Sequence, residues 1–392
     1  SLDFVITDIL LNGKSLEGFS KTVYDYEVQL PYASKAPEVT YTYDGFEKEV
    51  EIETVTTGND YVTTISYDGR VVYTINFQVD DEKPTALLNT LYKLQKGEQV
   101  TVGYFGGSVT NGTGASVADN YSWRALTRNW IIDTFKSVNS NIVERNAAIG
   151  GTGSVYGVYR ADRQFIMDKA PDLCFVEMAI NDGYDGIGVG SNKNYIYAES
   201  IVQKIYASNP KADIIFIITG DRGNLEGEVS RQNPYFGYVY TNLGEHYEIP
   251  CLYVGRELAL YIKENNNGIF PSGSSDPVWR QYYNDIVHPT DLGYAHYAAT
   301  IIDYLKTNLP VDYVPTAAEY KDKVLPEDTY CELNGKGELI VDAYTVAGDE
   351  IKTEDGSAIE NGNSALGGYY NSTSKTFMSK TKDDVISLQF KA

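Results

Sequence analysis

The sequence predicts an α/β fold, a doubly wound parallel sheet of five strands, flanked by N-terminal and C-terminal all-β modules. Between about residues 81 and 309, short apolar runs alternate with amphipathic stretches, as in strands joined by helical crossovers. Before and after this region the helical period is absent and alternating polar and apolar residues return. A chain of 392 residues is long enough for the three domains that result, at 1–80, 81–309 and 310–392.

The first 80 residues are expected to form a small β-sandwich. In 24–30, "YDYEVQL", apolar and aromatic residues alternate with polar ones, which is the period of a half-buried strand. Asp68 and Gly69 separate two further runs of this kind, a strong hairpin signal. Several strands without a helical stretch resemble the Ig-like and cadherin-like modules appended to bacterial extracellular enzymes.

The central region is expected to begin with a short helix over 84–97, since Leu87, Leu91 and Leu94 share one face between Pro84 and Gly97. In a doubly wound sheet, ligands bind beyond the carboxyl ends of the strands, so the loops that follow the strands are expected to carry the site. The expected strands are 99–105, 141–149, 172–180, 213–219 and 251–255, with helices such as 121–135 and 195–209, and the loops are 106–114, 150–154, 181–186 and 220–224.

The C-terminal part is expected to be a second β module. Strand-like runs return in 337–346, "GELIVDAYTV", and in 385–390, "VISLQF". Either the last run closes this module or the module is incomplete, and the pattern does not decide between the two.

The amino-acid composition argues against some classes of binding partner. The net charge of −22, from 32 basic and 54 acidic residues, makes nucleic acid and anionic membrane surfaces poor partners. The sequence contains no apolar run of 18 residues, so no transmembrane span is expected. The three cysteines form neither a disulfide framework nor a zinc-binding spacing.

Ser108 is the first candidate for a catalytic residue. It lies in "GYFGGSVTNGTG", 103–114, which lacks the lysine of a phosphate-binding loop and the spacing of a dinucleotide loop. The G-x-S-x-G pattern of a nucleophile elbow is absent as well. A serine directly after a glycine pair at a strand end remains, and a plain Gly-Ser turn is the alternative interpretation.

The histidines supply a candidate base. His288 lies three residues after Asp285, a spacing that allows the carboxylate to accept from Nδ1 and leaves Nε2 free to take a proton. A polar pair in a surface turn is the alternative. His246 and His296 lie in helical context and are interpreted as structural.

Two further loops offer neutral donors. Gly151 in "NAAIGGTGS" follows the second expected strand, and Asn181 in "MAINDG" follows the third. A backbone N–H and a side-chain amide are suitable donors to a tetrahedral oxyanion.

The order Ser, Gly, Asn, then Asp-x-x-His over residues 83–309 resembles the SGNH/GDSL hydrolase family. Ser108, Gly151, Asn181 and the pair Asp285 and His288 match its blocks, and the first block reads G-G-S, as in some bacterial carbohydrate esterases, in place of G-D-S. The resemblance implies a flavodoxin-like sheet, a Ser108, His288 and Asp285 triad, and an oxyanion hole of Ser108, Gly151 and Asn181. It implies no metal and no cofactor.

The expected function is removal of acetyl or other small acyl groups from a polysaccharide or oligosaccharide. Aromatic residues near the last block are candidates to stack on a sugar, although packing beneath the loop is an equal alternative. Two other functions stay open, a lipid or aryl esterase or thioesterase, and an inactive carbohydrate-binding or adhesion protein. The candidate substrate contacts are Trp279, Tyr282, Tyr283, Tyr184, Arg222 and Asn224.

The expected location is secreted or on the cell surface of a bacterium, inferred from the accessory β modules. Sequons occur at Asn111, Asn120 and Asn371, and a glycan on Asn111 would obstruct a site at Ser108.

Overall fold

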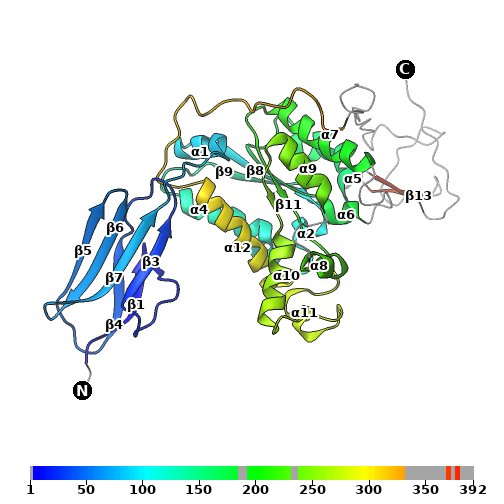
Figure 1. The fold of residues 1–392 in the computed structure, drawn as a ribbon. Helices are drawn as coiled ribbons and strands as arrows, with labels where there is room; N and C mark the ends of the chain where they lie inside the picture. Colours follow the sequence, from blue (N-terminus) through cyan, green and yellow to red (C-terminus); the bar gives the residue numbers. More distant parts are fainter. Residues whose placement is uncertain (1–2, 184–191, 231–236, 332–367, 372–375, 380–392) are drawn as a thin grey trace. The chain divides into compact units, whose positions relative to one another are not determined.

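The computed structural model describes residues 3–183, 192–230, 237–331, 368–371 and 376–379 (Figure 1). The chain divides into two compact units. The first comprises Ser1–Gly97 and Ile302–Tyr320, and the second comprises Glu98–Ile301 and Lys321–Ala392. The functional division at residues 80 and 309 stays a prediction.

The first unit contains the predicted β-sandwich. Two sheets contribute alternating apolar residues to one core, among them Ile6 and Ile9 from one sheet and Ile65, Ile75 and Phe77 from the other. One sheet has the order β2-β1-β4 and the other β3-β7-β6-β5. The strands are β1 (Val5–Leu11), β2 (Lys14–Ser15), β3 (Asp25–Leu30), β4 (Val39–Asp44), β5 (Val50–Thr57), β6 (Asp60–Tyr67) and β7 (Arg70–Val79).

The predicted hairpin joins β6 to β7. Tyr67 pairs with Arg70, so Asp68 and Gly69 form a two-residue loop. Their φ angles are 54° and 71°, and a turn with positive φ at both central positions matches the twist of the paired strands.

Helix α1 (Leu88–Gln95) is shorter than the predicted helix over 84–97. Leu87 has a φ of 56°, which is a left-handed conformation and therefore cannot belong to the helix. Later in the same unit, Tyr320 stacks on Tyr92 at 4.6 Å, and the Gln95 amide donates to the carbonyl of Val311. These contacts hold the segment that follows helix α12 (Asp291–Asn308) against α1.

The second unit contains the predicted five-stranded sheet (Figure 1). Its order is β12-β11-β10-β8-β9 with all neighbouring pairs parallel, which is the flavodoxin-like order. The last strand is shorter than expected, because helix α10 (Val254–Asn265) already begins at Val254. The strands are β8 (Val100–Gly106), β9 (Ile142–Asn146), β10 (Leu173–Glu177), β11 (Asp213–Ile217) and β12 (Cys251–Leu252).

Helices cover both faces of this sheet. On one face, Phe105 stacks on Phe165 at 4.7 Å, within a core that helices line. On the other face, Tyr104 stacks on Phe175 at 5.1 Å and meets Trp123 of α4 (Trp123–Phe135) edge-on. The helices of the first face are α5 (Ser154–Arg160), the π-helical turn η1 (Ala161–Ile166), α7 (Asn192–Ser208) and α9 (Tyr238–Tyr247).

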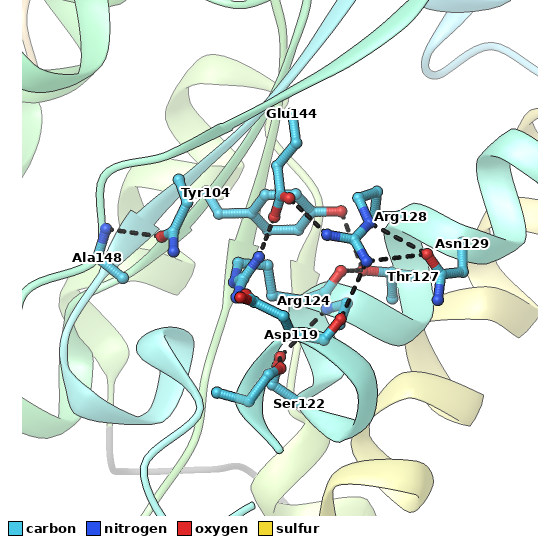
Figure 2. Close-up of polar contacts among 12 residues, drawn as sticks. Tyr104, Asp119, Ser122, Arg124, Thr127, Arg128, Asn129, Glu144 and Ala148 are labelled. Carbon is cyan, nitrogen blue, oxygen red and sulfur yellow. Dashed lines mark hydrogen bonds and ion pairs between the residues drawn. The ribbon is translucent and has the colours of Figure 1, made fainter.

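A cluster of ion pairs connects α4 to β9, the edge strand of the sheet (Figure 2). Glu144 of β9 accepts from Arg124 and, at 2.6 Å, from Arg128. Arg124 also pairs at 2.6 Å with Asp119 of the short helix α3 (Ala118–Tyr121), and its side chain is only 2% exposed. A buried guanidinium needs such partners, so this cluster decides how α3 and α4 sit on β9.

Near the C-terminus, β13 (Gly368–Asn371) pairs antiparallel with β14 (Thr376–Ser379). The strands predicted in 337–346 and 385–390 lie outside the described residues. In the described part of the chain, no helix has both the length and the apolar character needed to cross a membrane.

Candidate active site

Ser108 is the first residue of the short helix α2 (Ser108–Asn111), directly beyond the carboxyl end of β8. The two glycines before it are required by close packing. A Cβ on Gly107 would overlap the Asn181 amide nitrogen, and a Cβ on Gly106 would overlap the Thr110 hydroxyl. The φ of Gly107 is −93°, so this position needs a glycine for space and not for a left-handed turn.

His288 is distant from Ser108 in the sequence but lies beside it in the structure. Its Nε2 lies 2.9 Å from Ser108 Oγ, and its Nδ1 lies 2.7 Å from Asp285 Oδ2. An ionised carboxylate only accepts, so Nδ1 carries a proton toward Asp285 and Nε2 is left to accept from the serine hydroxyl. The structure thus joins Ser108, His288 and Asp285 in one hydrogen-bonded chain.

Asp285 is held ionised by its surroundings. Burial raises the pKa of its carboxyl, but hydrogen bonds from the His288 ring and from the backbone N–H groups of His288 and Val287 outweigh burial and lower this pKa below its usual value. Those N–H groups lie 2.7 and 2.8 Å from Oδ1. The side chains of Asp285 and His288 are 50% and 22% exposed, so the hydrogen-bonded chain opens to solvent.

Two hydrogen bonds from other segments fix the main chain of the loop that carries Asp285 and His288. Trp279 of α11 (Pro277–Tyr282) donates its indole N–H to the Asp285 carbonyl at 2.6 Å. The backbone N–H of Arg222 donates to the Ile286 carbonyl at 2.9 Å. Both bonds hold the main chain, so the Asp285 and His288 side chains need little ordering of their own.

The other two predicted loops also meet Ser108. Asn181 lies in α6 (Ala179–Asp182) after β10, and its Nδ2 donates to the Thr152 carbonyl at 3.3 Å. Gly151 has a φ of 73°, and a Cβ on the preceding Gly150 would lie 3.6 Å from Ser108 Cβ. The glycine loop and Asn181 therefore flank Ser108, while their role as oxyanion donors stays a prediction.

The expected sugar contact of Trp279 is corrected. Trp279 and Tyr283 are fully buried and stack on each other at 4.0 Å, so neither ring offers a face to a ligand. They pack beneath the Asp285 loop, which was the alternative interpretation. Tyr282 packs edge-on against Tyr261, and His296 lies among these rings, where burial lowers its pKa.

The weaker substrate candidates make structural contacts. Arg222, in α8 (Arg222–Glu228), donates to the Pro271 carbonyl and to Glu226. Asn224 donates to Asp221. Their contact with substrate stays a prediction, and Tyr184 lies outside the described residues.

Two buried charged residues next to Ser108 were not anticipated from the sequence. Glu177 ends the apolar strand β10, and an acidic residue in such a run was a usable signal. Arg160 ends α5. Nothing in its amphipathic surroundings marks it as different from a surface arginine.

A family model and several solved structures are similar to this chain. Residues 104–296 match the GDSL-like Lipase/Acylhydrolase family. A comparison with curated proteins gives no match. Among solved structures, the chain is similar to a two-domain esterase active on acetylated mannans, with 22% identity over 62% of this chain and a TM-score of 0.49. It spans only 57% of that esterase.

Two further structures are similar at lower identity. A lipase/acylhydrolase from Enterococcus faecalis is 17% identical, with 53% of this chain and 96% of that chain covered and a TM-score of 0.37. A psychrotrophic esterase from Pseudoalteromonas sp. is 19% identical, with coverages of 54% and 100% and a TM-score of 0.38. The family match includes Ser108, Asn181, Asp285 and His288, and the chain therefore carries a domain of the GDSL-like lipase/acylhydrolase family.

Proposed function

We propose that this protein is a serine esterase that removes acetyl or other small acyl groups from a polysaccharide or oligosaccharide. The observation that carries the proposal is the hydrogen-bonded chain from Ser108 Oγ through His288 to Asp285. A nucleophile, a base and a carboxylate that orients the base are the parts needed for acyl transfer through an acyl-enzyme.

In the proposed reaction, Ser108 Oγ attacks the ester carbonyl carbon while His288 Nε2 takes the serine proton. The negative charge that develops on the carbonyl oxygen is stabilised by the backbone N–H groups of Ser108 and Gly151 and by the Asn181 amide. Ser108 begins a helix, so its N–H has no partner within that helix. Thr152 occupies one N–H of the Asn181 amide and leaves the other for the oxyanion.

Collapse of this intermediate breaks the ester bond, and His288 gives its proton to the leaving alkoxide of the sugar. A water molecule then attacks the acyl-enzyme while His288 takes its proton. The second collapse releases the carboxylic acid and returns the proton to Ser108 Oγ. Asp285 stabilises the imidazolium in both halves of the reaction without taking a proton.

Two features support a small acyl group on a polymer. The residues packed against the Ser108 turn are small or polar, namely Gly150 and Asn181, which suits a short acyl chain. The half-exposed Asp285 and the partly exposed His288 suit a substrate that lies across the surface. A secreted or cell-surface location in a bacterium, next to such a polymer, is part of the proposal.

The test compares wild type with Ser108→Ala on chromogenic acetyl, butyryl and octanoyl esters and on acetylated xylan and mannan. We expect wild type to release acetate and Ser108→Ala to lose about 10³-fold or more of kcat/KM. Ser230→Ala is the matched control, because Ser230 is exposed and, among the described residues, its hydroxyl bonds to the nearby Gly227 carbonyl. This variant is expected to keep full activity.

Other outcomes identify the alternatives. Highest activity on the octanoyl ester and none on the polymers would show a lipid or aryl esterase. Equal background hydrolysis by wild type and Ser108→Ala would contradict an enzymatic role and favour a carbohydrate-binding or adhesion protein.

A further inference from the structure

The peptide group between Gly106 and Gly107, directly before Ser108, is hydrogen-bonded at both ends by buried charged side chains. The Gly106 carbonyl accepts from Arg160 Nη2 at 3.0 Å and from the Ile149 N–H at 3.0 Å. The Gly107 N–H donates to the Glu177 carboxyl. Within the described residues, no hydrogen bond or ion pair joins Arg160 or Glu177 to His288 or Asp285, so this arrangement is separate from the proposed triad.

Arg160 is 6% exposed and bonds to two of the loops that surround Ser108. Besides the Gly106 carbonyl, it donates to the Ala147 carbonyl and, at 2.9 Å, to the Thr152 hydroxyl in the glycine loop. Its guanidinium lies 4.4 Å above the Phe105 ring. Burial lowers its pKa to about 9, and within the described residues it has no carboxylate partner, unlike Arg124 in Figure 2.

Glu177 is fully buried on the opposite side of the same peptide. Its carboxyl accepts from the Thr110 hydroxyl of α2 and from the Thr219 hydroxyl after β11, each at 2.9 Å. Burial raises its pKa to about 7. Glu177 thus connects the Ser108 turn to the ends of β10 and β11, the two strands next in the sheet.

Two consecutive glycines give the backbone more conformational freedom than any other pair, and a rotation of the peptide between them would move the Ser108 N–H and Oγ. Hydrogen bonds at both the carbonyl and the N–H remove that rotation. A displacement of about 1 Å in a reacting group can lower a rate about 100-fold.

We propose that Arg160 and Glu177 are positioning residues that clamp the Gly106 to Gly107 peptide and thereby aim Ser108 at His288 and Asn181. The inference rests on the proposed esterase function and adds a required support to it. Arg160 fixes the carbonyl and the glycine loop together, and Glu177 fixes the N–H.

The test uses graded variants of the full chain, with kcat and KM measured separately on a short aryl acetate. Glu177→Gln keeps an acceptor for the Gly107 N–H, so its kcat is expected within about threefold of wild type. Arg160→Lys keeps the charge but loses the planar fork, and a loss of about tenfold in kcat is expected. Arg160→Met and Glu177→Met are expected to lose about 100-fold in kcat. KM should change little in all four.

Controls are other buried charged residues of the same unit. Arg124→Met and Glu199→Met remove side chains that are 2% and 0% exposed and bond elsewhere. Both are expected to lower Tm while kcat stays within about twofold, since neither residue touches the Ser108 turn. If either methionine variant at the clamp does not fold, the Lys and Gln variants still give the graded order.

Labelling with a fluorophosphonate probe separates this proposal from the proposed function. Wild type should be labelled at Ser108, Ser108→Ala should not, and the clamp variants should label more slowly in proportion to their kcat. Absence of labelling in wild type would overturn the esterase function itself. If wild type is labelled and the folded clamp variants keep the kcat of wild type, the clamp is overturned. Losses of kcat in the Arg124 and Glu199 controls equal to those in the clamp variants would overturn it as well.

Discussion

Gly107 illustrates how strongly one residue is constrained at this site. Its Cα lies against the Asn181 amide, and no side chain has space there. Its φ of −93° is not left-handed, so a left-handed backbone is not the reason for the glycine. The constraint is the close approach of two loops, the Ser108 turn and the segment that carries Asn181.

Gly107→Val is therefore expected to lower kcat about 100-fold or more, because the new side chain displaces Asn181 from Ser108. Tm should fall as well, since the overlap is with a neighbouring loop. Activity on the aryl acetate and thermal melting check both effects.

The control is Gly227→Ala, in α8, where a Cβ would meet nothing within 4 Å. That variant should keep full activity and gain up to about 1 kcal/mol of stability. Unchanged turnover in Gly107→Val would show that the contact with Asn181 is unimportant.

At the level of elements, the position of α4 on the sheet depends on a polar contact beside its apolar face. Trp123 and Phe135 of α4 are fully buried, as an amphipathic helix requires. The same helix carries Arg124 inward, where Glu144 of β9 and Asp119 both compensate its buried charge (Figure 2). The packing of this helix therefore requires an acid at one position of the neighbouring strand.

Glu144→Ala is expected to lower the free energy of unfolding by about 2–4 kcal/mol, because among the described residues Arg124 then keeps only Asp119 as a carboxylate partner. Urea denaturation followed by tryptophan fluorescence measures this change.

Lys136→Ala serves as the comparison. It removes a surface pair with Asp133 at 3.7 Å, whose side chains are 71% and 74% exposed, and it should change stability by less than about 0.5 kcal/mol. A cost for Glu144→Ala as small as that for Lys136→Ala would contradict the role of the cluster.

At the scale of the whole molecule, the topology of the parallel sheet determines where the candidate site residues come together. Segments that begin after β8, β9 and β10 meet at one edge because parallel strands all end there. The same geometry buries Glu177 below that edge. The stability of the fold is thereby linked to the protonation of a group next to the proposed active site.

Burial raises the pKa of Glu177 from 4.5 to about 7. Between these values the folded chain keeps a proton that the unfolded chain has lost, so this group makes stability fall as pH rises from about 4.5 to 7, by roughly 3 kcal/mol in total. Above pH 7 the loss is constant.

The difference in unfolding free energy between Glu177→Gln and wild type should therefore increase across that range. Urea unfolding at several pH values measures this difference. The increase should persist in about 0.5 M salt, because salt screens a desolvated group only weakly. A difference that does not change with pH would show that Glu177 is ionised throughout.

Local sequence patterns were sufficient to predict most of the fold. The alternation in β3, the Asp68-Gly69 turn and the five strands of the central sheet were all predicted, since each depends on the period of its own residues. Boundaries were less accurate. The start of α1 and the end of β12 depend on backbone conformations that the pattern does not contain.

The sequence by itself determined the fold class and supplied the candidates Ser108, Asp285 and His288. The glycine pair before Ser108 at a strand end and the three-residue spacing of Asp285 and His288 are each recognisable within one segment. Only the tertiary structure decided that Trp279 is buried and that Asn181 leaves no space for a side chain at Gly107. It also decided that Arg160 and Glu177 bond to the same peptide group, between Gly106 and Gly107. The physical reason is distance along the chain. Burial and close approach are set by segments that come together only when the sheet has formed.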